Sequence, residues 1–555
     1  MPKRIFVILC LVLLFSFASA QTSSSSFPPE ELLREIRPEA IRAHMEFLAD
    51  DLLEGRGTGT RGFQLAANYV RAQFEEMGLK PGGVGGTYFQ NIHLRKIELL
   101  RDQSSLIISR NGSEPKRVQK LVIDKDFVVV GDPLRTDTNA EAPVVFAGYG
   151  VTAPKFNYDD YARVDVRGKI VAALYGAPPS FPSAPGAHYS DSTVKVRNAV
   201  AHGAIGLLII WGGRVEERTP FSELIRFYRQ PTLRWLDAKG VPNDAEPNMR
   251  ARATVSSSAA AAMLEGSGKS WKEVLATALD SKPQAFPLEV KVSLHIVSRY
   301  SEVESPNIAA VLPGSDPQLR KEYVVFTAHA DHLGIGVPVN GDDIYNGAAD
   351  NASGTAALIE IARAFSRLPQ PPRRSLLFIA VTGEEEGLLG SDFYAHNPTV
   401  PMSQIVANVN MDEVSFLYDF RDIVPLGGEH SSLGAVAEDV ARHMGLEVSP
   451  DPAPEEVFFV RSDQYSFVEQ GVPSIYIEEG YQTLDPKLDG KKMQFDWENT
   501  RYHLPGDDMA QPLAFNAIVK CTRVNLAAGY EIAQRTARPR WNSGDFFEQF
   551  VRPAR

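Results

Sequence analysis

Residues 375–387 read Ser-Leu-Leu-Phe-Ile-Ala-Val-Thr-Gly-Glu-Glu-Glu-Gly, a continuous apolar run followed at once by three acids. Such a run is typical of a strand that is buried on both faces of a mainly parallel sheet. A similar run at 323–328 ends at His329, and a third, at 405–411, ends just before Asp412. Open parallel sheets place their sites beyond the carboxyl ends of the strands, where these polar residues lie. The sequence therefore predicts an α/β fold: a mainly parallel central sheet, flanked by helices, with a site at one edge.

The rest of the chain divides by pattern into a helical start, a β-rich middle and this α/β part. Apolar residues recur at helical spacing over 61–78, and a second helix is expected at 356–368. Between about 96 and 295, short β-like runs alternate with turns, which is typical of a small inserted β-rich domain. The expected organisation is a signal at 1–20, a leader at 21–29, the start of the catalytic domain at 30–95, an insert at 96–295, the main catalytic part at 296–535 and a polar tail at 536–555.

The first twenty residues are typical of a secretory signal. Lys3 and Arg4 precede an apolar run at 5–17, and Ala18-Ser19-Ala20 matches a cleavage site. An uncleaved membrane anchor is the alternative, whereas a lipoprotein is disfavoured because no small residues precede Cys10. We therefore expect a periplasmic or extracellular protein, with no membrane-spanning segment after cleavage.

Composition narrows the function classes further. Loss of Lys3 and Arg4 with the signal takes the formal charge from −12 to −14, which disfavours a general nucleic-acid-binding surface. Only Cys521 would remain, so no internal disulfide can form.

Metal-capable side chains follow the predicted strands. Taken alone, each has an ordinary explanation: a single histidine such as His329 is more often a core or surface residue, Asp350 is a good helix N-cap, and the glutamates at 384–386 can form a solvated turn. Together with Asp412, and with His503 in a late loop, they suit zinc or a similar divalent ion. Two such ions about 3.5–4 Å apart can share one bridging carboxylate.

These motifs resemble peptidase family M28, the co-catalytic zinc aminopeptidase type. The resemblance begins at residues 45–59, Met-Glu-Phe-Leu-Ala-Asp-Asp-Leu-Leu-Glu-Gly-Arg-Gly-Thr-Gly, and includes Glu-Glu-x-Gly-x-x-Gly-Ser at 384–391 and Tyr-His-x-Pro-x-Asp at 502–507. Residues 168–171 and 203–209 are similar to the protease-associated (PA) domain that exported members carry as an insert.

The resemblance implies a role for each residue. It implies that His329, Asp350 and Asp412 hold one zinc ion, that Asp350, Glu385 and His503 hold a second, and that Glu384 is the catalytic base. Asp331 matches the carboxylate that supports His329, and Glu386 is a neighbour. Ser462, Asp463 and Tyr502 are the expected substrate contacts. The bond after Asp350 is expected to be cis. His332 is interpreted as an ordinary core or surface residue.

There are two departures from the family pattern, at Leu504 and Gln464, where many relatives carry threonine and histidine. Neither position is a metal ligand in the family, so they affect only the expected pocket.

The expected function is an exported di-zinc exopeptidase, most often an aminopeptidase, that hydrolyses peptides with a metal-bridged water. The alternatives are a single-zinc glutaminyl-cyclase-like acyltransferase and a non-catalytic, receptor-like binding protein; the complete ligand set argues against both. Glu478, Glu479 and Arg461 are candidate substrate anchors, but their order along the chain cannot place them. The preferred peptide and the oligomeric state stay open.

Overall fold

The computed structural model describes residues 27–110, 117–282 and 284–551. The predicted signal at 1–20, and most of the leader, lie outside the described residues. Within the described part, no helix is both long and apolar enough to cross a bilayer.

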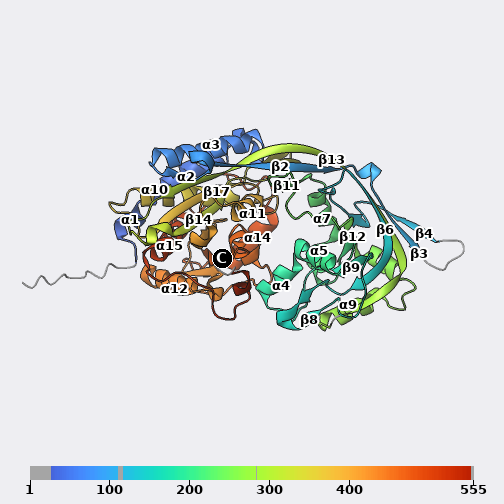
Figure 1. The fold of residues 1–555 in the computed structure, drawn as a ribbon. Coiled ribbons are helices and arrows are strands. Elements are labelled where there is room, and N and C mark those ends of the chain that lie inside the picture. Colours follow the sequence, from blue (N-terminus) through green and yellow to red (C-terminus); the bar gives the residue numbers. More distant parts are fainter. Residues whose placement is uncertain (1–26, 111–116, 283, 552–555) are drawn as a thin grey trace, which may run out of the picture.

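The predicted parallel sheet lies within one lobe of the molecule, on the left in Figure 1. Its strands are β14 (Tyr323–His329), β17 (Ser375–Val381), β18 (Ile405–Asn410) and β21 (Ser474–Glu479). β14 pairs in parallel with both β17 and β18, and β18 pairs in parallel with β21. Antiparallel strands complete the edges, β13 (Ala285–Leu312) beside β17 and β19 (Asp422–Leu426) beside β21. The predicted fold class is confirmed.

Both faces of this sheet are covered, which explains why its strands are continuously apolar. Leu376 and Phe378 of β17 face a core formed with α2 (Pro38–Leu48), α3 (Arg61–Glu76), α10 (Gly354–Ser366) and α15 (Phe515–Gln534). Their neighbours Leu377 and Ile379 face a second core on the other side. That core includes residues of α11 (Leu389–His396) and α13 (Gln464–Val468). Side chains alternate between the two faces of a strand, and both faces of β17 are covered by a core, so every residue of β17 is buried.

The helix predicted over 61–78 is α3, which is capped by the Thr60 side chain and ends at Glu76. Gly78, with φ +72°, turns the chain away, as expected of a residue that tolerates positive φ.

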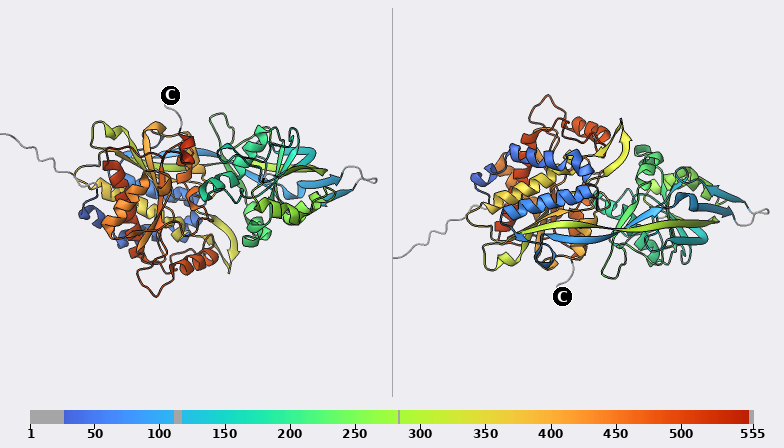
Figure 2. Two further views of the ribbon diagram at one scale, coloured as in Figure 1. Left: turned by 90° about the horizontal axis from the view of Figure 1, so that it is seen from below. Right: turned by 90° about the horizontal axis from the view of Figure 1, so that it is seen from above.

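A second lobe contains the β-rich region (Figure 2). Helices cover both faces of its sheet: α5 (Ser192–Ala201) packs on one face, and α4 (Ser183–Ser190), α8 (Ser257–Leu264) and α9 (Trp271–Leu279) pack on the other. Its strands are β3 (Ser105–Arg110), β4 (Val118–Leu121), β5 (Phe127–Val128), β6 (Asp137–Ala147), β9 (Ile170–Leu174), β10 (Gly206–Trp211) and β12 (Ala251–Ser256).

The two lobes are joined by strands and not by a flexible linker. β13 pairs with β3 and β6 over its first half, then with β2 (Phe89–Leu99) over residues 298–308. The boundaries expected at 95/96 and 295/296 therefore fall inside β2 and β13. In addition, β11 (Thr232–Trp235), from within the expected insert, pairs with β2.

The remaining elements are short or peripheral. They are α1 (Glu30–Arg34), α6 (Arg214–Arg218), α7 (Phe221–Tyr228), α12 (Leu433–Met444), α14 (Gly490–Thr500), β1 (Lys80–Pro81), β7 (Thr152–Ala153), β8 (Tyr158–Asp159), β15 (Gly334–Val339), β16 (Asp342–Tyr345) and β20 (Glu447–Val448).

The C-terminal segment corrects one expectation. Residues 536–555 were expected to form a polar tail, but Trp541, Phe546 and Phe547 are buried. Trp541 donates from Nε1 to the Gly471 carbonyl, and the Phe546 ring lies 5.5 Å from the ring of His188 in the insert. A few aromatic residues in a polar stretch provide enough apolar area to fix the segment across both lobes.

Candidate metal centre

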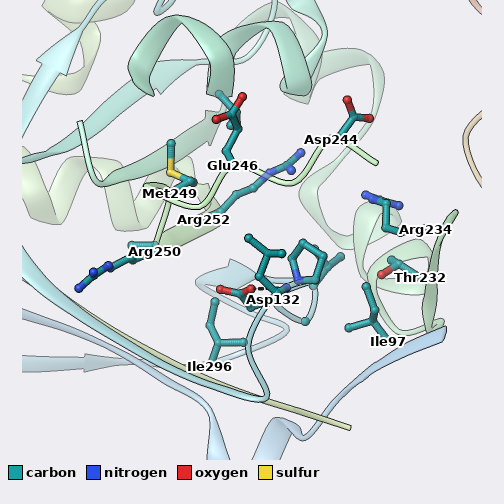
Figure 3. A pocket seen from close by; sticks show the side chains of 16 residues that line it. Ile97, Asp132, Thr232, Arg234, Asp244, Glu246, Met249, Arg250, Arg252 and Ile296 are labelled. Carbon is teal, nitrogen blue, oxygen red and sulfur yellow. Dashed lines mark hydrogen bonds between the residues drawn. The ribbon is translucent and has the colours of Figure 1, made fainter. Parts of the chain in front are cut away.

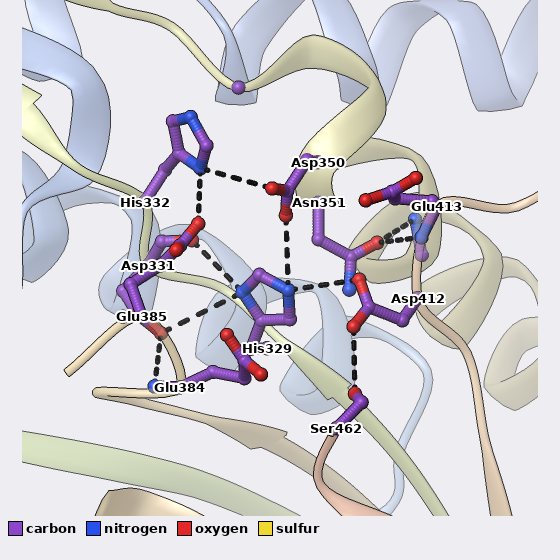
Figure 4. A network of polar contacts seen from close by, with 12 residues as sticks. His329, Asp331, His332, Asp350, Asn351, Glu384, Glu385, Asp412, Glu413 and Ser462 are labelled. Atoms are coloured by element: carbon purple, nitrogen blue, oxygen red, sulfur yellow. Dashed lines mark hydrogen bonds and ion pairs between the residues drawn. The ribbon is translucent and has the colours of Figure 1, made fainter. Parts of the chain in front are cut away.

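The predicted ligands converge at the carboxyl ends of the strands (Figure 4). His329 is the last residue of β14, Asp412 follows β18, and Glu384 and Glu385 follow β17. Asp350 lies in an irregular turn just before α10, and His503 lies in the loop after α14. Segments far apart in the sequence therefore meet at one edge of the sheet, as the strand pattern predicted.

Asp350 lies between the two histidines and offers one oxygen to each. His329 Nε2 is 3.2 Å from Asp350 Oδ1 and 3.0 Å from Asp412 Oδ1. On the other side, His503 Nε2 is 3.2 Å from Asp350 Oδ2 and 3.1 Å from Glu385 Oε2. Two neighbouring groups of donor atoms are thus formed, and Asp350 belongs to both.

The donor atoms fit zinc in type and in spacing. Zinc binds nitrogen and oxygen at about 2.0–2.1 Å in a tetrahedron, which places neighbouring ligand atoms about 3.3 Å apart. The separations around Asp350 are 3.0–3.2 Å. His329 Nδ1 donates to the Asp331 main-chain carbonyl, so Nε2 presents its lone pair to two carboxylates. The nitrogen lone pair and the carboxylate oxygens repel one another, and a cation bound between them would remove that repulsion.

The three consecutive glutamates have different environments. Burial, together with Asp412 and Glu385, raises the pKa of Glu384 well above its usual value. For Glu385, burial acts in the same direction, but the charges of His503 and His332 outweigh it and lower its pKa to about 2. Among the described residues, the clusters able to hold a metal include Glu384 and Glu385 but not Glu386.

Asp331 supports His329 through its main chain. The family resemblance implied that the Asp331 carboxylate supports His329, but that carboxylate is 3.9 Å from His329 Nδ1, whereas the Asp331 main-chain carbonyl is 3.2 Å away. The strand ends at His329, so the alternation of side chains does not continue to Asp331. The Asp331 carboxylate instead accepts from Thr58 Oγ1 and from the Glu384 main-chain N–H, at 3.0 and 3.3 Å.

The backbone around Asp350 is held from both sides. Asp507 accepts hydrogen bonds from the main-chain N–H groups of Ala349 and Asp350, at 2.9 and 3.0 Å. The Asp350–Asn351 peptide bond is cis, as expected. Asn351 donates to the Met411 carbonyl, which ties this turn to the end of β18.

Two residues behind the ligands were not assigned a role from sequence. Arg56 is fully buried and donates to four main-chain carbonyls, those of Leu48, Ala330, Asn346 and Gly347. His332, interpreted as an ordinary core or surface residue, has its Nδ1 only 2.6 Å from Glu385 Oε1. Arg56 lies in the quoted stretch at 45–59, but which groups it contacts depends on the tertiary fold.

A cleft of about 640 Å³ opens in front of the candidate ligands. Glu384, Ser462 and Tyr502 line it, and so do the three candidate anchors, Glu478, Glu479 and Arg461. The insert contributes further lining residues, Tyr175, Trp211 and Arg218.

The expected substrate contacts lie in different environments. Ser462 donates to Asp412 Oδ2 at 2.7 Å, and the Tyr502 ring stacks on His503 at 3.9 Å between centroids. Asp463, which was also expected to contact the substrate, is fully buried and does not line the cleft. It begins α13 beneath the site, and so it cannot touch a peptide in this conformation.

A smaller hollow in the insert, of about 50 Å³, holds Asp132, Arg234 and Arg252 among its lining residues (Figure 3). That volume accommodates only a few waters, because each needs about 10–15 Å³. The larger cleft is therefore the candidate site.

Comparison with known proteins agrees with this geometry. Residues 307–529, which carry every candidate ligand, match peptidase family M28. This part of the chain belongs to family M28. The chain is also similar in sequence to curated proteins. Over 120 residues it is 32% identical to leupeptin-inactivating enzyme 1 of Streptomyces exfoliatus, covering 20% of this chain and 25% of that protein. Over 279 residues it is 27% identical to a probable zinc metalloprotease of Pyricularia oryzae, covering 44% of this chain and 54% of the relative.

The chain spans between a quarter and about half the length of these two relatives. The chain also shares its fold with the aminopeptidase from Aneurinibacillus sp. strain AM-1. That likeness has a TM-score of 0.51 at 18% identity and covers 91% of this chain and 96% of the other.

Proposed function

We propose that this protein is an M28 zinc peptidase that holds two zinc ions and removes residues from the amino terminus of peptides. The observation that carries the proposal is the position of Asp350, whose two oxygens each lie 3.2 Å from a different histidine. A carboxylate shared in this way suits two ions side by side.

His329, Asp350 and Asp412 would hold one ion, and Asp350, Glu385 and His503 the other. When bound, zinc lowers the pKa of water toward neutrality and polarises a carbonyl oxygen. His329 and Asp350 are buried, so the protein around them fixes the positions of their ligand atoms. The centre is reached from the cleft, which Asp350, Glu384 and Asp412 line.

Glu384 is the proposed general base. Its side chain lines the cleft, and its main-chain N–H is fixed by Asp331. A base works best when its pKa is near the working pH, and burial raises the pKa of Glu384 in that direction. Glu384 would take the proton of the attacking water and deliver it to the leaving amine.

The charge of the cleft favours an amino terminus over a carboxyl terminus. Near the candidate ligands it is lined by Glu413, Glu478 and Glu479. Arg218, one of its two arginines, is already paired with Glu456 at 3.1 Å. Burial raises the pKa of Glu478 to about 8 and that of Glu479 to about 7, so a free α-amine, whose positive charge stabilises the ionised form of these groups, is favoured in the cleft over a substrate carboxylate.

Export by the signal at 1–20 and a PA-like identity for the insert are part of the same proposal. The insert supplies Tyr175 and Trp211 to the cleft, which supports a role in shaping the substrate site.

The test is an assay of aminoacyl anilides against matched N-acetylated peptides, combined with zinc counting on the purified protein. We expect two zinc ions per chain, hydrolysis of free-amine substrates only, loss with a chelator and recovery with zinc. Glu384→Gln should keep both ions and lose about 10²–10⁴-fold in kcat. One zinc ion per chain with cyclisation of N-terminal glutamine would favour the glutaminyl-cyclase-like alternative. Two zinc ions without hydrolysis of any peptide would refute the peptidase.

A further inference from the structure

His332 lies beside the candidate centre on the side away from the cleft. Its side chain is fully buried, with Nδ1 2.6 Å from Glu385 Oε1 and 3.8 Å from Asp350 Oδ2. His332 Nδ1, His332 Nε2 and Glu385 Oε1 have no well-aligned hydrogen bond to any described group, so the 2.6 Å approach of Nδ1 to Oε1 is a close polar contact between two atoms that lack other partners. A buried carboxylate oxygen and a buried ring nitrogen are each costly without a partner, so the two atoms serve each other.

The two oxygens of Glu385 face different histidines. Oε2 is 3.1 Å from His503 Nε2, the separation expected of two ligands of one zinc ion, whereas Oε1 is 2.6 Å from His332. The second distance is too short for neighbouring ligands, about 3.3 Å apart around zinc, and fits a charge-assisted hydrogen bond. Glu385 can therefore bind a metal through one oxygen while the other is held from behind.

The imidazole of His332 cannot turn away. A Cβ added at Gly347 would lie 2.5 Å from the ring, so the main chain packs directly against it. The main-chain N–H of His332 donates to the Arg56 carbonyl at 3.3 Å, and Gly57 forms a backbone bridge with His332. The backbone that carries the ring is thus fixed, and the turn that leads to Asp350 packs against the ring itself.

We propose that His332 is a positioning residue of the second metal site: it donates from Nδ1 to Glu385 Oε1 and so directs Oε2 at the ion. The inference rests on the proposed two-zinc centre and deepens it. His332 is not a ligand in this proposal, although with Asp350 and Glu385 it forms a group that could hold a metal. Outer partners of metal ligands typically contribute about 10–100-fold in metal affinity.

The experiment compares His332→Leu, His332→Asn and His332→Gln in the full chain. Zinc per chain is measured after equilibration against a graded series of chelator concentrations, which separates the tighter from the weaker ion. An asparagine amide can place an N–H where Nδ1 lies, whereas a glutamine amide reaches past it toward the Nε2 position. His44→Leu is the matched control, since His44 is also buried and also faces a carboxylate, that of Glu360 at 3.2 Å.

We expect His332→Leu and His332→Gln to lose about 10–100-fold in affinity for one ion only, with His332→Asn close to wild type and His44→Leu unchanged. If His332→Leu does not fold, the contrast between Asn and Gln decides. Equal zinc binding by all variants would overturn the proposal, and so would equal loss in Asn, Gln and Leu, which would mark His332 as a ligand. A wild-type protein that binds fewer than two ions would instead count against the proposed function.

Discussion

Replacing Arg56 with methionine would remove the support shared by the loops that carry the metal ligands. The guanidinium donates to the Ala330 carbonyl, next to His329, and to the carbonyls of Asn346 and Gly347, which precede Asp350. A fourth bond reaches Leu48 at the end of α2. Burial lowers the pKa of Arg56 to about 10, and the nearby acids oppose that shift, so the group stays charged at neutral pH.

The expected loss in the free energy of unfolding of Arg56→Met follows from the four main-chain carbonyls that lose their hydrogen-bond donor. A buried polar group without its partner costs about 1–3 kcal/mol. At the low end of that range, four orphaned carbonyls destabilise the fold by about 4 kcal/mol. Methionine recovers part of any larger loss, because it removes a buried charge and fills most of the space. Since typical domains are stable by only about 5–15 kcal/mol, the change would be large.

Urea unfolding, followed by tryptophan fluorescence with and without zinc, measures this loss. We expect a much lower midpoint for Arg56→Met and a weaker dependence on zinc, because the ligand loops are no longer fixed. Arg167→Met is the control: Arg167 is exposed and its ion pair among the described residues is with Asp165, so its loss should change stability by less than about 0.5 kcal/mol. If Arg56→Met unfolds within about 1 kcal/mol of wild type and binds zinc normally, Arg56 does not hold the site as argued.

Three further predictions follow from the same contacts. Asp350→Ala should lose both zinc ions, and metal counting that finds two would refute the bridge. Thr58→Val removes a bond to Asp331 and should lower kcat by about tenfold with little change in KM, corresponding to about 1.4 kcal/mol; an equal change in both would indicate a different role. His188, which contacts Tyr465 across the lobes, has its pKa lowered by burial to about 4. His188 takes up its proton near pH 6.5 in the unfolded chain but only near pH 4 in the folded one. The free energy of unfolding is therefore unaffected by this proton above pH 6.5, and it falls by up to about 1.4 kcal/mol per pH unit as the pH drops toward 4. His188→Phe should flatten this part of the pH profile in thermal unfolding.

The sheet, and the polar residues that directly follow its strands, were predictable because both depend on local pattern, whereas the expectation for His503 rested on the family resemblance. β14, β17 and β18 are buried on both faces, so each appears in the sequence as an unbroken apolar run. Parallel pairing then brings their carboxyl ends to one edge, and the polar residues that follow must meet there. No pairing of particular residues had to be known in advance.

The features that sequence reasoning missed depend on contacts between distant segments. Arg56 meets Asn346 only because α2 and the turn before α10 are neighbours in space. The boundaries expected at 95/96 and 295/296 fall inside strands because β2 and β13 each pair in both lobes or at their junction, and a long strand has no compositional break. Asp463 was expected at the substrate because it adjoins Ser462, but adjacent residues at the start of a helix point in different directions.

Which of the two adjacent glutamates, Glu384 or Glu385, binds metal and which acts as the base depends on their exact positions in the chain. The two carboxylates are adjacent in the chain, and burial raises the pKa of both. Glu385 is turned toward His503 and His332, whose charges hold it ionised, as a ligand must be. Glu384 faces the cleft, where burial and the neighbouring carboxylates outweigh the opposing charge of His329 and raise its pKa, which suits a group that takes and returns a proton. If the chain were shifted by one residue, the proposed base would face the two histidines, and the glutamate at the metal would have the raised pKa. The spacing to Gly390-Ser391 therefore carries mechanistic information that the composition of the acidic run does not.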